Sequence, residues 1–343
     1  MTILFIDGAS KGGIEKSIEI YSDSLNRLGI DSKIICYSSK SKTNSNYFYF
    51  DSIQKLLSYI SNNDIENIIF FKNYSKFFWI KFFVKSKIFV RSSNTPTLLI
   101  WDFTLKRFLA EFFKLLTYNF SDFIISNSIE NSTLLRKLYF RPVVTIRNFE
   151  SPSKRLTLPK FASTTFIFVS RIEKQKNPFL VIEAFYLALK INPKLRLIII
   201  GDGSELIYLK KLVNQFGIEY AIRFEIFGVD KSHFLSQAHC AIFSSKYEGL
   251  PNVLLEYMSY DLPILYNECK TGVRELMQNY NLGIKYDFQN KFSLAKKLVD
   301  FNFQNFVTLK SNSKEILGLM KEEFNQNIKN IFYNGIDSEN FSK

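Results

Sequence analysis

Short apolar runs alternate along the chain with longer stretches in which apolar residues recur at the spacing of an amphipathic helix. The first run, ILFI at 3–6, leads into a helical pattern near 13–28. Further runs that predict strands follow at 32–37, 67–72, 87–91, 122–127 and 143–146. Because strands that alternate with helices build parallel sheets with helices on both faces, this half of the chain is predicted to be an α/β domain.

The stretch from 148 to 164 interrupts this alternation, because it contains two prolines and several Ser and Thr residues without periodicity, as a linker would. A helix is then expected to begin at Asn177-Pro178, where Asn would cap it. Domains at 1–150 and 151–310 are therefore predicted, followed by a helical segment at 311–343; whether that segment returns to the first domain the sequence leaves open. Strands of the second domain are predicted at 165–170, 195–200, 224–228, 240–244 and 263–266.

The composition fits a globular protein of this size. Hydrophobic residues make up 46% of the 343, enough for two cores. No apolar run is long enough for a transmembrane helix, and the first residues lack the features of a signal peptide. Three widely spaced cysteines and two histidines indicate neither a disulfide framework nor a zinc site. We therefore expect a cytoplasmic protein that uses no metal and no cofactor.

Residues 1–150 carry 20 basic and 13 acidic residues, a balance of +7 out of the net charge of +13, and this excess is concentrated in one segment. Residues 72–114 hold nine basic and two acidic residues, interleaved with Phe and Trp. This mixture suits an anionic membrane surface, which would place the protein at the inner face of the plasma membrane. A helix with an aromatic core face and a solvated basic face explains it equally well, and both interpretations stay open. Nucleic acid is not expected as a partner, because the chain has none of the usual recognition motifs.

The clearest motif is YEGLPNVLLEYMSYDLPI at 247–264. Glu248 follows a predicted strand, Pro251 opens a helix, and Glu256 lies on that helix eight residues after Glu248. The free amides at a helix start favour phosphate oxygens. One carboxylate could then lie beside a bound sugar while the other accepts hydrogen bonds from hydroxyl groups. An ordinary loop glutamate and an exposed helical one are the alternative.

Two further motifs also follow predicted strands. SRIEKQKNP at 170–178 places two cations, Arg171 and Lys176, five residues apart. Gly12 and Gly13 follow the first strand and precede a helix. Without a ligand to bind, these would be ordinary surface cations and a simple turn. Ligands of open parallel sheets bind beyond the carboxyl ends of the strands, where all these motifs lie.

Together the motifs resemble those of the family-four retaining glycosyltransferases, or glycosyl transferases group 1. The resemblance covers about residues 1–290 and is specific over 165–276. It implies a GT-B fold, with two Rossmann-like domains whose parallel sheets face each other across a cleft, and a nucleotide-diphosphate sugar as donor. Glu248 would then lie near the transferred sugar, Glu256 near the donor ribose, and Arg171 and Lys176 at the diphosphate. Catalytic roles fall to Glu248, Arg171 and Lys176, and donor binding to Gly12, Gly13, Gly228, Gly249, Leu250, Pro251, Asn252, Val253 and Glu256.

The chain departs from the family pattern in two places. Tyr257 and Asp261 stand where the family has alanine and glycine. No histidine precedes His233, whereas many members carry one after the strand predicted at 87–91. Ser93 or Asn94 could supply the sugar or acceptor contact instead, and the donor phosphate would have to take the acceptor proton.

The resemblance implies a retaining hexosyltransferase that acts in bacterial surface polysaccharide synthesis, on O-antigen, capsule or lipopolysaccharide. A lipid-linked saccharide is the acceptor we expect, because the basic aromatic segment lies in the domain that binds acceptors in this fold. The alternative is a catalytically silent binding or scaffold protein of the same fold. Retention of Glu248, Glu256, Arg171 and Lys176 argues against that alternative.

Overall fold

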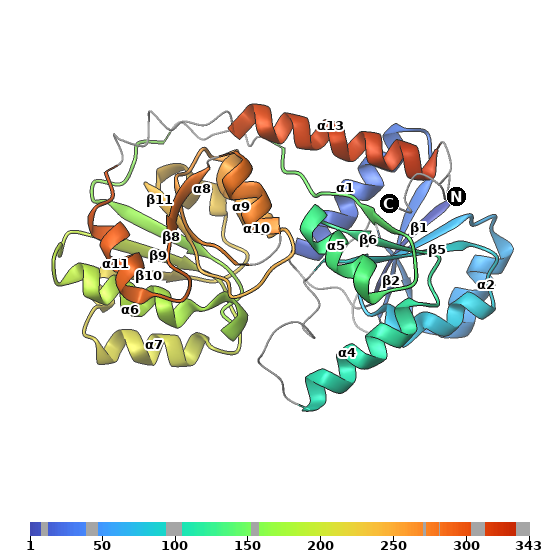
Figure 1. Ribbon diagram of the computed structural model, residues 1–343, viewed down its shortest axis with the longest axis horizontal. Coiled ribbons are helices and arrows are strands. Elements are labelled where there is room, and N and C mark those ends of the chain that lie inside the picture. Colours follow the sequence, from blue (N-terminus) through green and yellow to red (C-terminus); the bar gives the residue numbers. More distant parts are fainter. Residues whose placement is uncertain are drawn as a thin grey trace. The chain divides into compact units, whose positions relative to one another are not determined.

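A computed structural model describes residues 1–7, 13–38, 47–93, 105–151, 158–269, 272–280, 282–302 and 313–333. The chain divides into two compact units (Figure 1). Unit 1 comprises Met1–Asn148 together with Glu322–Lys343, and unit 2 comprises Phe149–Lys321.

Unit 1 is built on a seven-stranded parallel sheet in the order β3-β2-β1-β4-β5-β6-β7. The strands are β1 (Thr2–Asp7), β2 (Ser32–Tyr37), β3 (Tyr47–Phe50), β4 (Asn67–Phe70), β5 (Lys87–Ser92), β6 (Phe123–Ser126) and β7 (Val143–Thr145). The helices between them are α1 (Gly13–Arg27), α2 (Ile53–Asn62), α3 (Tyr74–Phe77), the 3-10 helix η1 (Phe78–Phe82), α4 (Leu105–Tyr118) and α5 (Ile129–Leu138).

The two faces of this sheet are covered by different helices, because successive strand residues point to opposite sides. Phe5 and Val90 belong to a core shared with α2, α3 and α5. On the other face, Phe89 of β5 packs against Phe332 of α13 (Ser313–Phe332), with ring centroids 4.9 Å apart. The strand order reverses between β1 and β4, which is where ligands of such sheets bind.

The second half of α13 belongs to unit 1. Phe324 packs edge-on against Tyr21 of α1, with ring centroids 5.0 Å apart. Glu323 forms an ion pair with Arg147. These contacts anchor residues from the far end of the sequence to a domain that the chain left at Asn148.

Unit 2 has a six-stranded parallel sheet in the order β10-β9-β8-β11-β12-β13. The strands are β8 (Thr165–Val169), β9 (Arg196–Ile200), β10 (Ile222–Glu225), β11 (Cys240–Phe243), β12 (Ile264–Asn267) and β13 (Gly283–Tyr286). The connecting elements are η3 (Lys174–Lys176), α6 (Pro178–Leu189), α7 (Leu206–Gln215), η4 (Glu219–Ala221), α8 (Lys231–Gln237), α9 (Asn252–Ser259), α10 (Gly272–Asn279) and α11 (Lys291–Val299).

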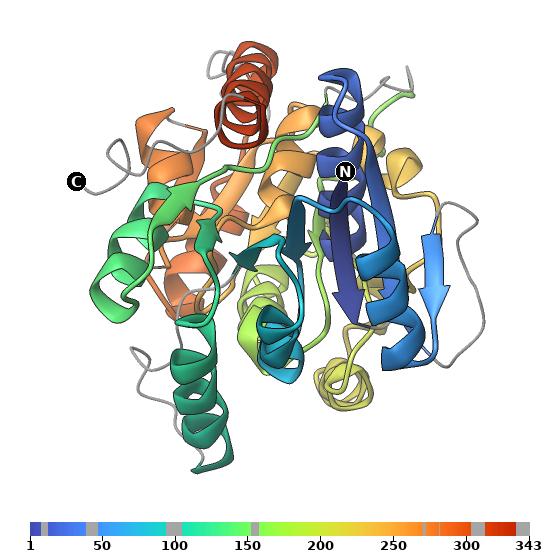
Figure 2. The same ribbon diagram turned by 90° about the vertical axis from the view of Figure 1, so that its right-hand side faces the viewer.

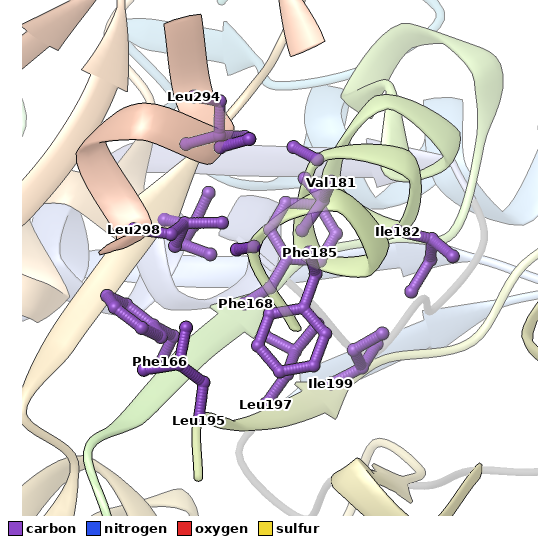
Figure 3. Close-up of a cluster of buried hydrophobic side chains, with 14 of the residues drawn as sticks. Phe166, Phe168, Val181, Ile182, Phe185, Leu195, Leu197, Ile199, Leu294 and Leu298 are labelled. Atoms are coloured by element: carbon purple, nitrogen blue, oxygen red, sulfur yellow. The ribbon is translucent and has the colours of Figure 1, made fainter. Parts of the chain in front are cut away.

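A continuous apolar core lies under α6 and α11 of unit 2. Figure 3 shows Val181 and Phe185 of α6 directed toward Leu197 of β9, with Leu294 and Leu298 of α11 beside them. All five side chains are fully or almost fully buried. Full burial of one such side chain contributes about 1.5–3 kcal/mol, so this layer holds α6 and the loop before it against the sheet.

The predicted α/β architecture with parallel sheets is confirmed, and four local predictions need correction. Strands β3 and β13, each four residues long, were missed. The strand predicted at 224–228 lies at Ile222–Glu225, because pairing with β9 stops at Glu225. Asn177 does not cap α6: it adopts a left-handed conformation (φ 54°) that ends η3, and its side chain makes no capping hydrogen bond.

The turn after β9 is packed against the start of the loop that carries Arg171. A Cβ atom on Gly201 would overlap the carbonyl oxygen of Ser170. Gly201→Ala should therefore destabilise unit 2 by about 3 kcal/mol, seen as a lower urea midpoint. Gly318→Ala is the matched control, since that added methyl meets nothing within 4 Å and favours α13 by up to about 1 kcal/mol. An unchanged midpoint for Gly201→Ala would show that the turn can move aside.

Candidate functional site

The central feature of unit 2 is an ion pair between Lys176 and Glu248. Lys176 ends η3 in the loop after β8, and Glu248 lies in the loop after β11. Because β8 and β11 are paired parallel strands, their carboxyl ends meet at one edge of the sheet. The Lys176 and Glu248 side chains are only 14% and 7% exposed, so this is a largely buried ion pair.

Backbone contacts hold the two loops together around the pair. The Lys246 amide donates to the Gln175 carbonyl over 2.8 Å, and Gln175 Nε2 donates to the Tyr247 carbonyl over 2.9 Å. Ser244 Oγ donates to the Lys176 carbonyl over 2.7 Å. The geometry of the pair is therefore preset by neighbouring backbone, which is what an electrostatic site requires.

Glu256 lies on α9, which starts after Pro251, and forms a second ion pair. Its Oε1 accepts from Lys231 Nζ over 2.5 Å, and Lys231 is the first residue of α8. No described residue donates to its other carboxylate oxygen. Glu256 thus offers an oriented acceptor for a hydroxyl group. Sequence reasoning did not find Lys231, because no motif links it to Glu256.

Arg171 does not join the buried ion pair of Lys176 and Glu248. Its side chain is 54% exposed and pairs with Glu173 over 2.8 Å, not with Glu248. An exposed pair of this kind contributes about 0–1 kcal/mol, so a stronger anion can replace Glu173 at little cost. The structure therefore brings Lys176 and Glu248 together and leaves the Arg171 guanidinium open to solvent.

The other predicted donor contacts lie in two turns. Gly249, Leu250, Pro251, Asn252 and Val253 form the passage from the Glu248 loop into α9. Gly228 has φ 112°, with open space where a Cβ would lie, between β10 and α8.

The predicted contacts of the N-terminal half belong to unit 1. Gly13 is the first residue of α1, and Ser93 directly follows β5. Gly12 and Asn94 lie outside the described residues.

Tyr257 and Asp261, two of the residues that depart from the family pattern, each have a structural basis. Tyr257 is fully buried, and its hydroxyl accepts from the Val169 amide over 2.9 Å at the end of β8. Burial raises the pKa of this phenol far above its usual range, so it stays neutral. Asp261 has φ 47°, the left-handed conformation that favours glycine. Among the described residues, no group of three or more His, Cys, Asp or Glu side chains could hold a metal ion.

Comparisons with known proteins agree with this architecture. The family model for glycosyl transferases group 1 matches residues 157–302. An uncharacterized glycosyltransferase of Methanocaldococcus jannaschii is 33% identical over 140 residues, which is 39% of this chain and 34% of that protein. The crystal structure of Anabaena HepE with UDP and glucose matches 97% of this chain and 100% of that chain, with a TM-score of 0.78 and 16% identity.

A functionally named relative comes from Campylobacter jejuni. It is the N-acetylgalactosamine-N,N'-diacetylbacillosaminyl-diphospho-undecaprenol 4-alpha-N-acetylgalactosaminyltransferase, 24% identical over 62% of this chain and 60% of that protein. The alignments with these two curated relatives span 34% and 60% of their lengths. Two units with parallel sheets and helices define a GT-B fold. Residues 157–302 thus match the group 1 glycosyltransferases, and both curated relatives are named as glycosyltransferases.

The buried ion pair leads to a stability test. Lys176→Met leaves Glu248 buried without its partner, and we expect a loss of about 3 kcal/mol in unfolding free energy. Adding Glu248→Gln removes the unpaired charge and should recover most of that loss. Urea denaturation of both single variants and the double variant measures the coupling. Additive losses would show that the two side chains do not interact.

Proposed function

We propose that this protein transfers a hexosyl group, with retention of configuration, from a nucleotide-diphosphate sugar to a saccharide acceptor in bacterial surface polysaccharide synthesis. The observation that carries the proposal is the buried Lys176–Glu248 pair beside the start of α9. A catalytically silent binding protein would need the anion-binding groups, but it would not need a buried carboxylate held ready beside them.

The charges divide the site into two functional parts. The diphosphate becomes more negative as its bond to the sugar breaks, so it needs positive groups beside it. Those groups are Lys176, Arg171 and the backbone amides at the start of α9. Glu248, held by the Lys176 ammonium, is the carboxylate that stabilises the positive sugar carbon. Glu256, with one oxygen fixed by Lys231, accepts from the ribose hydroxyls. The departing phosphate takes the acceptor proton, so the reaction needs no cofactor and no divalent metal.

The acceptor we propose is a saccharide on a lipid diphosphate. The printed name of the Campylobacter jejuni relative specifies a diphospho-undecaprenol acceptor. A relative of Salmonella typhimurium, 24% identical over 173 residues, is named a lipopolysaccharide 1,6-galactosyltransferase. Both names describe sugar transfer to molecules that carry lipid, which requires that the enzyme reach a membrane surface.

The structure refines which residues of the 72–114 segment could contact a membrane. Phe70, Phe71 and Phe77 are buried, and Arg91 is buried too, so none of these belongs to a surface. We define the aromatic surface as the exposed side chains of η1, α4 and the residues beside them: Phe82, Phe83, Phe108, Leu109, Phe112, Phe113, Leu116 and Phe120.

Ring contacts join members of the aromatic surface in two places. Phe82 and Phe120 lie 5.7 Å apart between ring centroids, and Phe108 and Phe112 lie 6.4 Å apart. Figures 1 and 2 show α4 extending beyond the other helices of unit 1. Lys85 and Lys87 are exposed, whereas Lys81 is held by Asp122 over 2.5 Å. No described helix is long and apolar enough to cross a bilayer. We therefore propose peripheral binding to the inner leaflet, with α4 in the interface.

The division of roles in the donor site is tested by transfer assays with a panel of UDP-, GDP-, ADP- and TDP-sugars. Glu248→Gln should lower kcat at least a hundredfold with little change in nucleotide affinity, because Glu248 faces the reacting sugar. Glu256→Gln should mainly weaken nucleotide binding, by about tenfold for a lost hydrogen bond. Arg171→Ala with Lys176→Ala should weaken binding of the free nucleotide as well.

The metal-free mechanism is tested separately: activity lost in chelator and restored by magnesium would contradict it. A wild-type protein that neither hydrolyses nor transfers the donor sugar would favour the catalytically silent binding protein.

The membrane contact is tested by sedimentation with anionic vesicles. Wild type should sediment at low salt and be partly released at high salt, since each basic residue near the surface contributes about 1 kcal/mol. Phe108→Ser, Phe112→Ser and Leu116→Ser together should abolish sedimentation, and Lys85→Glu with Lys87→Glu should reduce it. Ile207→Ser with Tyr208→Ser on α7 is the control, because those exposed apolar residues lie in unit 2. If the wild-type protein does not sediment with the vesicles at low salt, the proposed membrane contact is wrong.

A further inference from the structure

Arg91 is a buried cation whose charge no described carboxylate neutralises. It lies near the end of β5 and is 4% exposed. Its Cζ lies 5.8 Å from the ring centroid of Tyr21 and 5.5 Å from that of Phe71. Its Nε has no partner among the described residues. Burying a guanidinium costs several kcal/mol unless a counter-ion offsets it, and no described residue supplies one.

The Arg91 guanidinium sets the direction of the Ser93 hydroxyl. Nη1 donates to Ser93 Oγ over 2.5 Å. A guanidinium can only donate, so Ser93 Oγ must be the acceptor, and its own O–H is left to donate. No described residue receives that hydrogen bond. Asn127 Nδ2 donates to the Ser93 carbonyl over 2.9 Å and fixes the backbone there. Ser93 therefore presents an O–H donor with a positive charge directly behind it.

The same guanidinium ties this strand end to the start of α1. Nη2 donates to Asn148 Oδ1 over 2.7 Å, and Asn148 Nδ2 donates to Ser17 Oγ over 3.2 Å. Ser17 Oγ in turn donates to the Gly13 carbonyl over 2.8 Å. The first turn of α1 and the Ser93 backbone are thus held in one network. A helix start carries partial positive charge, which adds to that of Arg91.

We propose that Ser93 donates a hydrogen bond to an anionic phosphate oxygen of a substrate, and that Arg91 is the positioning residue that directs this hydroxyl and supplies the charge behind it. The inference rests on the proposed glycosyl transfer. It gives a role to the loop that carries Ser93, where related enzymes have a histidine. The phosphate has two sources, the lipid diphosphate of the acceptor and the diphosphate of the donor.

The experiment measures KM for donor and acceptor with matched serine variants. One acceptor probe is N-acetylgalactosaminyl diphosphate on a short polyprenol, and the other is the neutral methyl N-acetylgalactosaminide. Ser93→Ala should raise one KM about tenfold with kcat little changed, the effect of one lost hydrogen bond. Ser93→Thr keeps the hydroxyl and should stay within about twofold of wild type. Ser92→Ala is the control, because it makes the same chemical change one residue earlier, at a buried hydroxyl that bonds to no described residue.

The two acceptors separate the two sources of phosphate. If the phosphate belongs to the acceptor, Ser93→Ala raises the KM for the diphosphate probe and leaves the KM for the neutral acceptor unchanged. A donor source predicts a raised donor KM with either acceptor. Ser93→Ala kinetics equal to wild type for all substrates would overturn the inference.

A mutant cycle tests whether Arg91 acts through Ser93. Arg91→Lys should raise the same KM about tenfold and add nothing in the Ser93→Ala background. Effects that multiply to about a hundredfold would show that Arg91 acts independently, contrary to the inference. If Arg91→Lys fails to fold, Ser93→Ala alone decides. If wild type transfers sugar to no acceptor, the proposed function fails. Calorimetry with UDP and with the diphosphate probe then compares the affinities of wild type and Ser93→Ala. A tenfold weaker affinity of Ser93→Ala supports the phosphate contact, and equal affinities refute it.

Discussion

The ion pair between Lys176 and Glu248 is the interaction on which the candidate site of unit 2 depends. Each partner would be costly to bury alone, and each is held by a loop that follows one of two neighbouring strands. Hydrogen bonds from Lys246, Gln175 and Ser244 connect these loops, so the two charged side chains are held in position before any ligand binds. Arranging charges in advance is the main way in which a protein stabilises developing charge in a reaction.

The buried cation of unit 1, Arg91, has no carboxylate partner among the described residues. Arg91 is surrounded by aromatic rings, by the amide oxygen of Asn148 and by the hydroxyl of Ser93, with no described carboxylate. Lys176, which is paired, fixes the position of a carboxylate and is proposed to bind the diphosphate as well. Arg91, which has no carboxylate partner among the described residues, is proposed to act on an incoming anion through Ser93.

Much of this could be predicted from the sequence, because parallel sheets place the residues that follow their strands at one edge. That rule alone places Lys176 and Glu248 near one another. Contacts between elements that no motif connects could not be predicted, as with Lys231 and Glu256. Which of the nine basic residues at 72–114 lie at the surface could not be predicted either: Arg91 is buried, because composition records charge whereas burial depends on which face of β5 a residue occupies.

The most direct test of the donor site is a crystal structure with the nucleoside diphosphate that stabilises the protein best. The account predicts the diphosphate at the start of α9, with Lys176 Nζ and the Arg171 guanidinium within hydrogen-bond distance of its oxygens. It also predicts the ribose hydroxyls on Glu256. A nucleotide bound elsewhere, with Arg171 still on Glu173 and Glu256 contacting only Lys231, would contradict the assignment of this site.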